Sequence, residues 1–221
     1  NTFPMGTGIA SSASAFAALA TAAVAAADAH LGERELSALA RLGSGSAARS
    51  IPGGFVRWTS ASAHLDSFAE SIAPPDHWDL RDLVAVVSRA HKAVGSSGGH
   101  DLATTSPFFA PRLLGLHQRV EAVQKAIMDR DLATLGPLID AEALELHAVA
   151  MTSRAPLLYW VPATLVVLDR VARIRAEGLA AYFTLDAGPN VHVLCEGAHA
   201  SALEEALRAL REVEAVYHNR A

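Results

Sequence analysis

The sequence predicts an α+β fold in two domains. It opens with a long alanine-rich helical segment, carries short apolar β patterns further along, and shows no strict alternation of strand and helix. Its 221 residues, 51% of them hydrophobic, are enough for one large core or two modest ones. Pro74-Pro75-Asp76 is the best linker candidate. We therefore expect a boundary near residue 78, with domains over 1–78 and 79–221.

Two helices and one strand are predicted before this boundary. Ser12–Leu31 reads as one helix that stops at Gly32, and its nearly uniform apolar surface predicts that it is buried between other elements. Glu33–Leu42 follows as a short amphipathic helix with leucines at helical spacing. A strand is expected over Phe55–Trp58, after a second loop rich in small residues.

Elements of both kinds are predicted beyond the boundary. Leu80–Ser88 reads as a buried strand, because its centre is a continuous run of aliphatic residues. Two strands, Leu179–Leu185 and Val191–Cys195, flank a turn signal at 186–190 and are expected to pair. The remaining predicted elements are helices over about Pro107–Asp129, Leu132–Met151, Pro162–Glu177 (capped by Gly178) and Ala198–Arg211, and a last strand over Val213–Tyr217.

Charge and composition narrow the class of partner. The formal net charge is -5, with 18 Lys and Arg against 23 Asp and Glu, and no basic stripe is visible. We therefore expect a small molecule as the partner and do not expect nucleic acid. The lone cysteine, Cys195, lies in an apolar run and is interpreted as a buried strand residue of a protein from a reducing cytoplasm.

The amino-terminal stretch resembles neither a membrane span nor a secretion signal. The alanine-rich segment Ala13–Ala27 is too short and too weakly hydrophobic to cross a bilayer. No basic start precedes an apolar block. The chain begins at Asn1 in the middle of a motif and without methionine, so we expect further residues upstream.

The most informative stretch is the first glycine loop, Pro4–Ser14, which leads directly into the alanine-rich helix. Glycines allow close backbone approach to an anion, and the unpaired N–H groups and dipole of a helix N-terminus attract negative charge. This pattern predicts a phosphate cradle. A serine-capped buried helix after a glycine turn is the alternative.

Two further loops combine glycine with serine, at residues 43–50 and 95–100. Hydroxyls of Ser44, Ser46, Ser96 and Ser97 suit phosphate oxygens, although the same composition is typical of flexible loops. Arg49 follows three small residues, where its guanidinium either grips a carboxylate or phosphate or lies solvated at the surface.

Asp186 ends the predicted strand Leu179–Leu185 between two apolar neighbours, so we expect it to be partly buried. It either orients a hydroxyl group of a substrate or bonds the backbone of Gly188 within its own turn. The ten histidines show no metal-ligand spacing, and no GxSxG nucleophile elbow is present. Neither a transition-metal site nor a serine nucleophile is expected.

Taken together, four segments resemble the GHMP kinase superfamily and, within it, the mevalonate diphosphate decarboxylases. They are PMGTGIASSASAFAA from Pro4, ARLGSGSAARSIPGG from Ala40, GSSGGHDLATTSP from Gly95 and YFTLDAGPN from Tyr182, in the order and spacing of that family. The resemblance implies a truncated N-terminal ATP-binding domain, like the second domain of a ribosomal small-subunit protein, followed by a ferredoxin-like C-terminal domain.

The resemblance also implies the chemistry. ATP and Mg²⁺ phosphorylate the 3-hydroxyl of mevalonate 5-diphosphate or 5-phosphate, and loss of phosphate and carbon dioxide leaves an isopentenyl product. Asp186 corresponds to the catalytic aspartate and Arg49 to the arginine that holds the substrate carboxylate. The other positions carried over are Ser44, Ser46, Ser96 and Ser97 for substrate, and Gly6, Gly8, Ser11, Ser12 and Ser14 for ATP. Family members are commonly homodimers, and a cytoplasmic enzyme is expected.

Some features depart from the family pattern. The N-terminal strands with their lysine and tyrosine contacts are missing, Gly99 is followed by His100 where methionine is usual, and Glu145–Met151 differs from the commoner Gln-Phe-His-Ala-Thr version. The changes at His100 and at Glu145–Met151 lie near the substrate side of the family's site. The substrate can therefore be either the 5-monophosphate or the 5-diphosphate. A kinase of the same fold that does not decarboxylate, and a nucleotide-binding module without turnover, remain the alternative functions.

Overall fold

The computed structural model describes residues 6, 9–90 and 95–220, and the chain divides into two compact units, Asn1–Trp78 and Asp79–Ala221. Gly8, one of the predicted ATP-binding residues, lies outside the described residues. Helices and strands are mixed without strict alternation, as an α+β fold requires. No helix among the described residues combines the length and apolar character needed to cross a bilayer.

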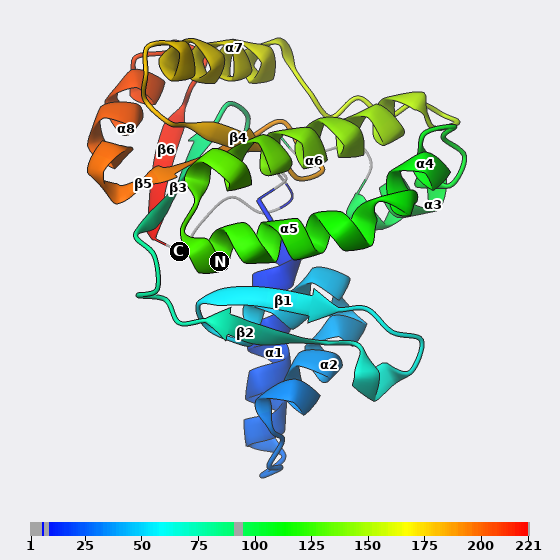
Figure 1. Ribbon diagram of the computed structural model, residues 1–221. Helices are drawn as coiled ribbons and strands as arrows, with labels where there is room; N and C mark the ends of the chain where they lie inside the picture. Colours follow the sequence, from blue (N-terminus) through cyan, green and yellow to red (C-terminus); the bar gives the residue numbers. More distant parts are fainter. Residues whose placement is uncertain (1–5, 7–8, 91–94, 221) are drawn as a thin grey trace. The chain divides into compact units, whose positions relative to one another are not determined.

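The first unit packs two helices and a short helical turn against a β-hairpin (Figure 1). Helix α2 contacts strand β2, and α1 contacts α2 and the 3₁₀ turn η1. Strands β1 and β2 are antiparallel, with a register shift next to Phe55. The elements are α1 (Ser11–Ala26), α2 (Glu33–Gly43), η1 (Gly45–Ser50), β1 (Phe55–Thr59), η2 (His64–Asp66) and β2 (Phe68–Ala73).

Ser37 is the buried polar residue that joins three parts of this unit. Its hydroxyl donates to the backbone oxygen of Ala48 at 2.9 Å and accepts from the N–H of Ala69 at 2.8 Å. One side chain on α2 thereby holds both η1 and β2. The position of η1 matters because it carries Arg49.

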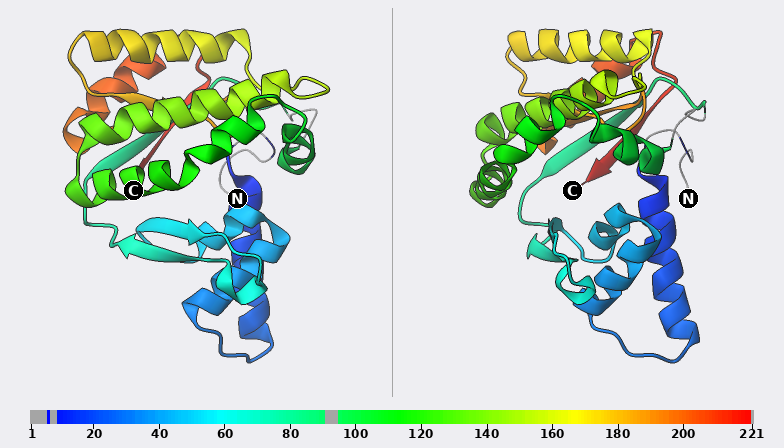
Figure 2. Two further views of the ribbon diagram at one scale, coloured as in Figure 1. Left: turned by 45° about the vertical axis from the view of Figure 1, so that its right-hand side comes forward. Right: turned by 90° about the vertical axis from the view of Figure 1, so that its right-hand side faces the viewer.

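The second unit contains an antiparallel sheet of four strands in the order β4-β5-β3-β6. Its core lies between one sheet face and helices α6, α7 and α8, where Leu83, Val167, Val193 and Leu203 are fully buried. Helix α5 packs along α6, as both views of Figure 2 show. The elements are β3 (Leu80–Val86), α3 (Ser96–Ala103), α4 (Phe109–Leu114), α5 (Leu116–Asp129), α6 (Leu132–Thr152), α7 (Pro162–Ala176), β4 (Tyr182–Thr184), β5 (Val191–Glu196), η3 (Gly197–His199), α8 (Ala200–Arg208) and β6 (Ala215–Arg220).

The interpretation of Cys195 is confirmed, because it lies on β5 with none of its surface exposed. Burial raises the pKa of its thiol to about 11. The predicted stop at Gly178 is also confirmed: this residue follows α7 at φ 99°, and the N–H of Leu179 reaches back to the oxygen of Ile174.

The prediction for α1 is wrong in two respects. The helix ends at Ala26 instead of Leu31, because Asp28 takes a left-handed conformation (φ 50°) and the N–H of Ala29 bonds to the oxygen of Val24. It is also not buried all round: within α1 only Ala13 and Ala17 are buried. Its apolar composition reflects small alanines, of which α2 and η1 cover one side.

Four other expectations need correction. Strand β2 was not predicted, since Glu70 and Ser71 interrupt its apolar pattern. The third glycine-serine loop is instead the helix α3. Gly115 divides the predicted helix 107–129 into α4 and α5, and β4 is shorter than the predicted strand 179–185.

Candidate active site

Helix α1 has an N-cap residue that supplies no side-chain cap. Its N-cap, Ala10, is in the left-handed region (φ 32°, ψ 34°) and contributes no side-chain bond. The hydroxyl of Ser14 donates to the backbone oxygen of Ser11 instead. The serine-capped, buried helix that was the alternative here is therefore wrong, and the helix end retains the character that favours an anion.

The first glycine loop approaches this helix end through Gly6. Gly6 has φ 73°, a left-handed conformation that glycine adopts without steric cost, and its N–H donates to the hydroxyl of Ser11 at 3.1 Å. The loop and the first residue of α1 are thus joined directly.

Hydroxyls of the first two predicted loops meet within the first unit. Ser12 and Ser44 lie 3.2 Å apart between their Oγ atoms, and Ser44 and Ser46 lie 3.4 Å apart. Residues more than thirty positions apart in the sequence therefore form one row of donors and acceptors. Such a row suits the oxygens of a phosphate group.

Arg49 lies beside this row in sequence, on η1, with its side chain exposed. Its guanidinium carbon is 5.8 Å from the ring centre of Trp58 on β1. Among the described residues no carboxylate pairs with it. The charge is therefore available to an incoming anion, although its aromatic contact means that it is not simply solvated.

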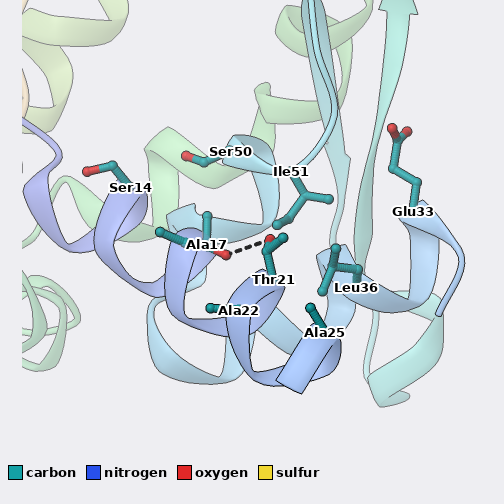
Figure 3. A pocket seen from close by; sticks show the side chains of 10 residues that line it. Ser14, Ala17, Thr21, Ala22, Ala25, Glu33, Leu36, Ser50 and Ile51 are labelled. Carbon is teal, nitrogen blue, oxygen red and sulfur yellow. Dashed lines mark hydrogen bonds between the residues drawn. The ribbon is translucent and has the colours of Figure 1, made fainter. Parts of the chain in front are cut away.

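A hollow of about 770 Å³ lies along α1, away from the uncapped helix end (Figure 3). The alanines of α1 face Leu36 and Ile51 across it, with Ser14 and Ser50 at its edge. Glu33 is the charged side chain of the lining, and a carboxylate repels phosphate. The hollow is therefore not suited to phosphate, although Ser14, a predicted ATP-binding residue, lines it.

Asp186 lies in the second unit, immediately after β4, and its side chain is exposed. The expectation of partial burial is wrong, because Asp186 is exposed between the buried Leu185 and the buried end of the turn at Asn190. The alternative role within its own turn is only partly right: the N–H of Gly188 donates to the backbone oxygen of Asp186 at 2.7 Å, not to the carboxylate. Among the described residues no donor bonds this carboxylate, so it is available to a ligand.

Buried side chains fix the turn that carries Asp186. Thr164 donates from its hydroxyl to the backbone oxygen of Pro189 at 2.7 Å. Asn190 is 1% exposed; its Oδ1 accepts from the N–H groups of Val87 and Ser88, and its Nδ2 donates to the oxygen of Ser88. The turn is thereby tied to α7 and to the end of β3.

Two histidines that sequence reasoning passed over lie next to this turn. His147 on α6 is 1% exposed, and burial lowers the pKa of its ring to about 4. His192 on β5 has its Nδ1 2.9 Å from Asp82. Burial alone would lower the pKa of His192, but the Asp82 carboxylate outweighs it, so the pKa lies above its usual value. The available signal for His147 was its place at helical spacing from Ala143 and Asp140, which share the buried face of α6.

Ser96 and Ser97 begin α3, after the N-cap Gly95. Their side chains lie outside the described part of the structure, so the predicted phosphate contacts of these serines stay predictions. Arg49 belongs to the first unit and Asp186 to the second, and no three His, Cys, Asp or Glu side chains gather as a metal site in the residues described.

The fold and these loops are those of a GHMP-type small-molecule kinase or decarboxylase, and comparison with known proteins narrows the class. Residues 1–69 match the model of the diphosphomevalonate decarboxylase-like N-terminal domain, and residues 82–219 match that of the mevalonate 5-diphosphate decarboxylase C-terminal domain. The chain belongs to the mevalonate diphosphate decarboxylase family.

Three relatives illustrate the similarity. Diphosphomevalonate decarboxylase of Candida albicans is 38% identical over 90% of this chain and 56% of its own length. Phosphomevalonate decarboxylase of Haloferax volcanii is 35% identical over 94% of this chain and 63% of its own length. A solved structure, MDDEF in complex with MVAPP, AMPPCP and magnesium, is 38% identical, with a TM-score of 0.90 over 98% of this chain and 67% of that one. The chain thus spans less than two thirds of these two curated relatives.

Proposed function

We propose that this chain carries the catalytic part of an ATP-dependent decarboxylase of the mevalonate pathway. The substrate is mevalonate 5-diphosphate or 5-phosphate, and the product is the corresponding isopentenyl ester. The observation that supports this most is the match of both family domains, in order, across residues 1–69 and 82–219. The solved relative with MVAPP, AMPPCP and magnesium supports ATP and Mg²⁺ as its partners.

In this proposal the ATP phosphates lie at the uncapped end of α1. Gly6, Gly8, Ser11, Ser12 and Ser14 belong to this site. Two observations support it: the left-handed Gly6 allows the loop to approach the helix closely, and the N-cap Ala10 supplies no side-chain cap, which leaves backbone donors of α1 for an anion. Mg²⁺ supplies charge neutralisation for the phosphates during transfer. The row of hydroxyls of Ser12, Ser44 and Ser46 supplies hydrogen bonds to the same phosphates.

Asp186 and Arg49 act on the substrate. The 3-hydroxyl oxygen bonds to the γ-phosphorus of ATP while the bond to ADP breaks. Asp186 orients this hydroxyl and accepts its proton late, as the new oxygen–phosphorus bond forms. The new 3-phosphate then departs with the C–O electron pair, and Asp186 stabilises the positive charge that develops on the tertiary carbon. Arg49 holds the substrate carboxylate, which leaves as carbon dioxide. The electron pair of the carbon–carbon bond that breaks forms the double bond of the product. Ser96 and Ser97 grip the phosphate tail.

Asp186 and Arg49 are both exposed, and neither charged group has a partner of opposite charge within described residues 6, 9–90 and 95–220. This supports their roles, because each charge is available to a ligand. The proposal requires the two to converge when substrate is bound. We further propose a homodimer that works in the cytoplasm; sedimentation of the purified protein tests the first point.

The test is ATP turnover by the complete gene product with mevalonate, its 5-phosphate and its 5-diphosphate side by side, with carbon dioxide measured in parallel. Equal amounts of ADP and carbon dioxide with one phosphorylated substrate are expected, and the preferred substrate separates monophosphate from diphosphate. A stable 3-phosphate without carbon dioxide would make the protein a kinase. No ATP consumption with any of the three would leave a binding module.

A further inference from the structure

We propose that Trp58 is a positioning residue for this reaction: its indole ring supports the guanidinium of Arg49 and the loop around Gly45, and so sets where the substrate carboxylate is held. This role rests on the proposed function, in which Arg49 holds that carboxylate. Trp58 acts through these neighbours and not on the reacting atoms.

Trp58 lies within the first unit on β1, the strand that pairs with β2 (Figure 1). Its indole N–H donates to the hydroxyl of Ser67 at 3.2 Å. Ser67 is 2% exposed and stands directly before β2, so the group that anchors the ring is itself buried. Because an indole has a single donor, this bond limits the orientations of the ring.

The guanidinium of Arg49 lies over this ring. Its central carbon is 5.8 Å from the ring centre. The negative face of an aromatic ring attracts a cation within about 6 Å, and tryptophan provides the strongest such face. The ring therefore restrains a guanidinium that is exposed to solvent and to an incoming anion.

An aromatic support leaves the arginine free to bind. A salt bridge would also restrain Arg49, but it would use some of the N–H donors and offset the charge. In the described part of the chain no acidic side chain pairs with Arg49. The contact with Trp58 thus restrains the guanidinium while its N–H donors and its charge stay available to a carboxylate.

The same ring also contacts the loop that carries the predicted substrate serines. A Cβ atom added to Gly45 would lie 3.5 Å from Cη2 of Trp58, an ordinary van der Waals distance. Ser44 and Ser46 flank Gly45, and their hydroxyls are 3.4 Å apart. One indole therefore lies beside both the serine hydroxyls and the guanidinium of Arg49, and the spacing between these groups depends on it.

A second arginine of the first unit provides a comparison. Arg34 lies over the ring of Phe68 at 3.9 Å, but its Nη2 also pairs with Asp66 at 3.3 Å. The aromatic contact there accompanies a salt bridge, whereas at Arg49 it accompanies a charge without a carboxylate partner among the described residues. Phe68 is therefore the matched control for Trp58.

The test compares Trp58→Leu, Trp58→Phe and the control Phe68→Leu in the complete gene product. Leucine removes the aromatic face of residue 58, and phenylalanine keeps a smaller face without the N–H. The control removes an aromatic support from an arginine outside the proposed site. The readouts are kcat, the KM values for ATP and for mevalonate 5-phosphate or 5-diphosphate, and the melting temperature.

We expect Trp58→Leu to lower kcat/KM for the mevalonate substrate about tenfold, with KM for ATP within about twofold of wild type. Trp58→Phe should lose less, because its ring still attracts the cation. Phe68→Leu should lower the melting temperature and keep kcat/KM within about twofold of wild type. Equal losses of kcat/KM in the two Trp58 variants, or in Trp58→Leu and Phe68→Leu, would overturn the proposal.

A double-mutant cycle shows whether Trp58 acts through the arginine. In the Arg49→Met background, Trp58→Leu should change kcat/KM by less than about twofold, because the group that it supports is already gone. A further tenfold loss there, as large as in the wild-type background, would overturn the proposal. If Trp58→Leu does not fold, Trp58→Phe takes its place in the cycle.

A measurement without turnover separates this inference from the proposed function. Aromatic ring currents shield protons above a ring, so the Nε–H proton of Arg49 should resonate upfield in wild type relative to Trp58→Leu. The same position in both proteins would contradict the contact. If the wild type turns over no substrate while this shift is present, the proposed function fails and the contact stands. If the wild type is active and Trp58→Leu matches it, the inference fails and the function stands.

Discussion

The turn of Asp186 and the helical turn of Arg49 hold their charged residues in different ways. Thr164 and Asn190 fix the backbone of the turn that carries Asp186, from α7 and the end of β3. The backbone at Arg49 depends on Ser37, and the guanidinium itself on the face of Trp58. The difference teaches that several elements fix the backbone of the turn that carries Asp186, whereas the backbone next to Arg49 depends on the hydroxyl of Ser37 alone among these supports.

Removing the carboxylate should have the largest effect. Asp186→Ala is expected to lower kcat by more than about 1,000-fold, with KM for ATP changed little, because Asp186 acts on the reacting hydroxyl. Steady-state kinetics with separate titration of ATP and substrate measures both. Asp186→Asn is the matched control, since it keeps the shape and removes the charge. A normal rate in either variant would show that the role is misassigned.

The buried ring of His147 on α6 predicts a dependence of stability on pH. His147 has a pKa of about 4 in the folded protein against about 6.5 unfolded, so the unfolded state binds more protons between these values. Its contribution is complete above pH 6.5 and is lost as the pH falls towards 4, by up to about 3 kcal/mol. Urea unfolding at pH 7 and pH 4.5 measures this loss, and His147→Leu should show a smaller one. The same loss in both proteins would contradict the burial of a neutral ring.

Substitutions of Arg49 test the role of its guanidinium. Arg49→Met should lower kcat/KM by about 100-fold through lost alignment of the substrate carboxylate. Arg49→Lys keeps the charge without the planar fork and should fall between methionine and wild type. Kinetics of both variants beside wild type provide the measurement. A lysine variant as poor as methionine would show that the flat guanidinium, and not its charge, is what matters.

The smallest effect is expected for Ser37, whose hydroxyl holds η1, and it concerns stability instead of activity. Ser37→Ala removes one donor and one acceptor from a buried position and should cost about 1 to 3 kcal/mol of unfolding free energy. Denaturant unfolding measures this cost. Ser71→Ala, a change at a part-buried hydroxyl of the neighbouring strand, is the control and should cost less. An equal cost for both would mean that Ser37 is no special link between α2, η1 and β2.

Sequence patterns predicted the elements in which the spacing of apolar residues and the capping residues match the burial found in the structure. α2, α6, α7 and β5 were predicted within two residues at each end, because regular apolar spacing and caps such as Gly178 mark them. β2 escaped prediction because Glu70 and Ser71 interrupt its apolar pattern, while its pairing with β1 depends on backbone hydrogen bonds. The exposed surface of α1 was missed because alanine content alone does not say how many neighbours a helix has.

Some features of the candidate site could likewise be predicted from the sequence, and others could not. Glycine and serine runs indicated the first two loops, and the structure brings Ser12, Ser44 and Ser46 together. The residues that support the turn of Asp186, among them Thr164 and Asn190, could not be identified, since each is an ordinary polar residue until the fold shows what it touches. The roles of Asp186 and Arg49 remain predictions from the family resemblance.

The buried thiol of Cys195 has a practical use. With its pKa raised to about 11, it holds almost no thiolate at neutral pH and should react slowly with maleimides. Cysteines introduced at the exposed Leu42 and Leu158 could then carry spin labels with little background from this chain. Spectra recorded with and without nucleotide would report the separation of the two units in solution.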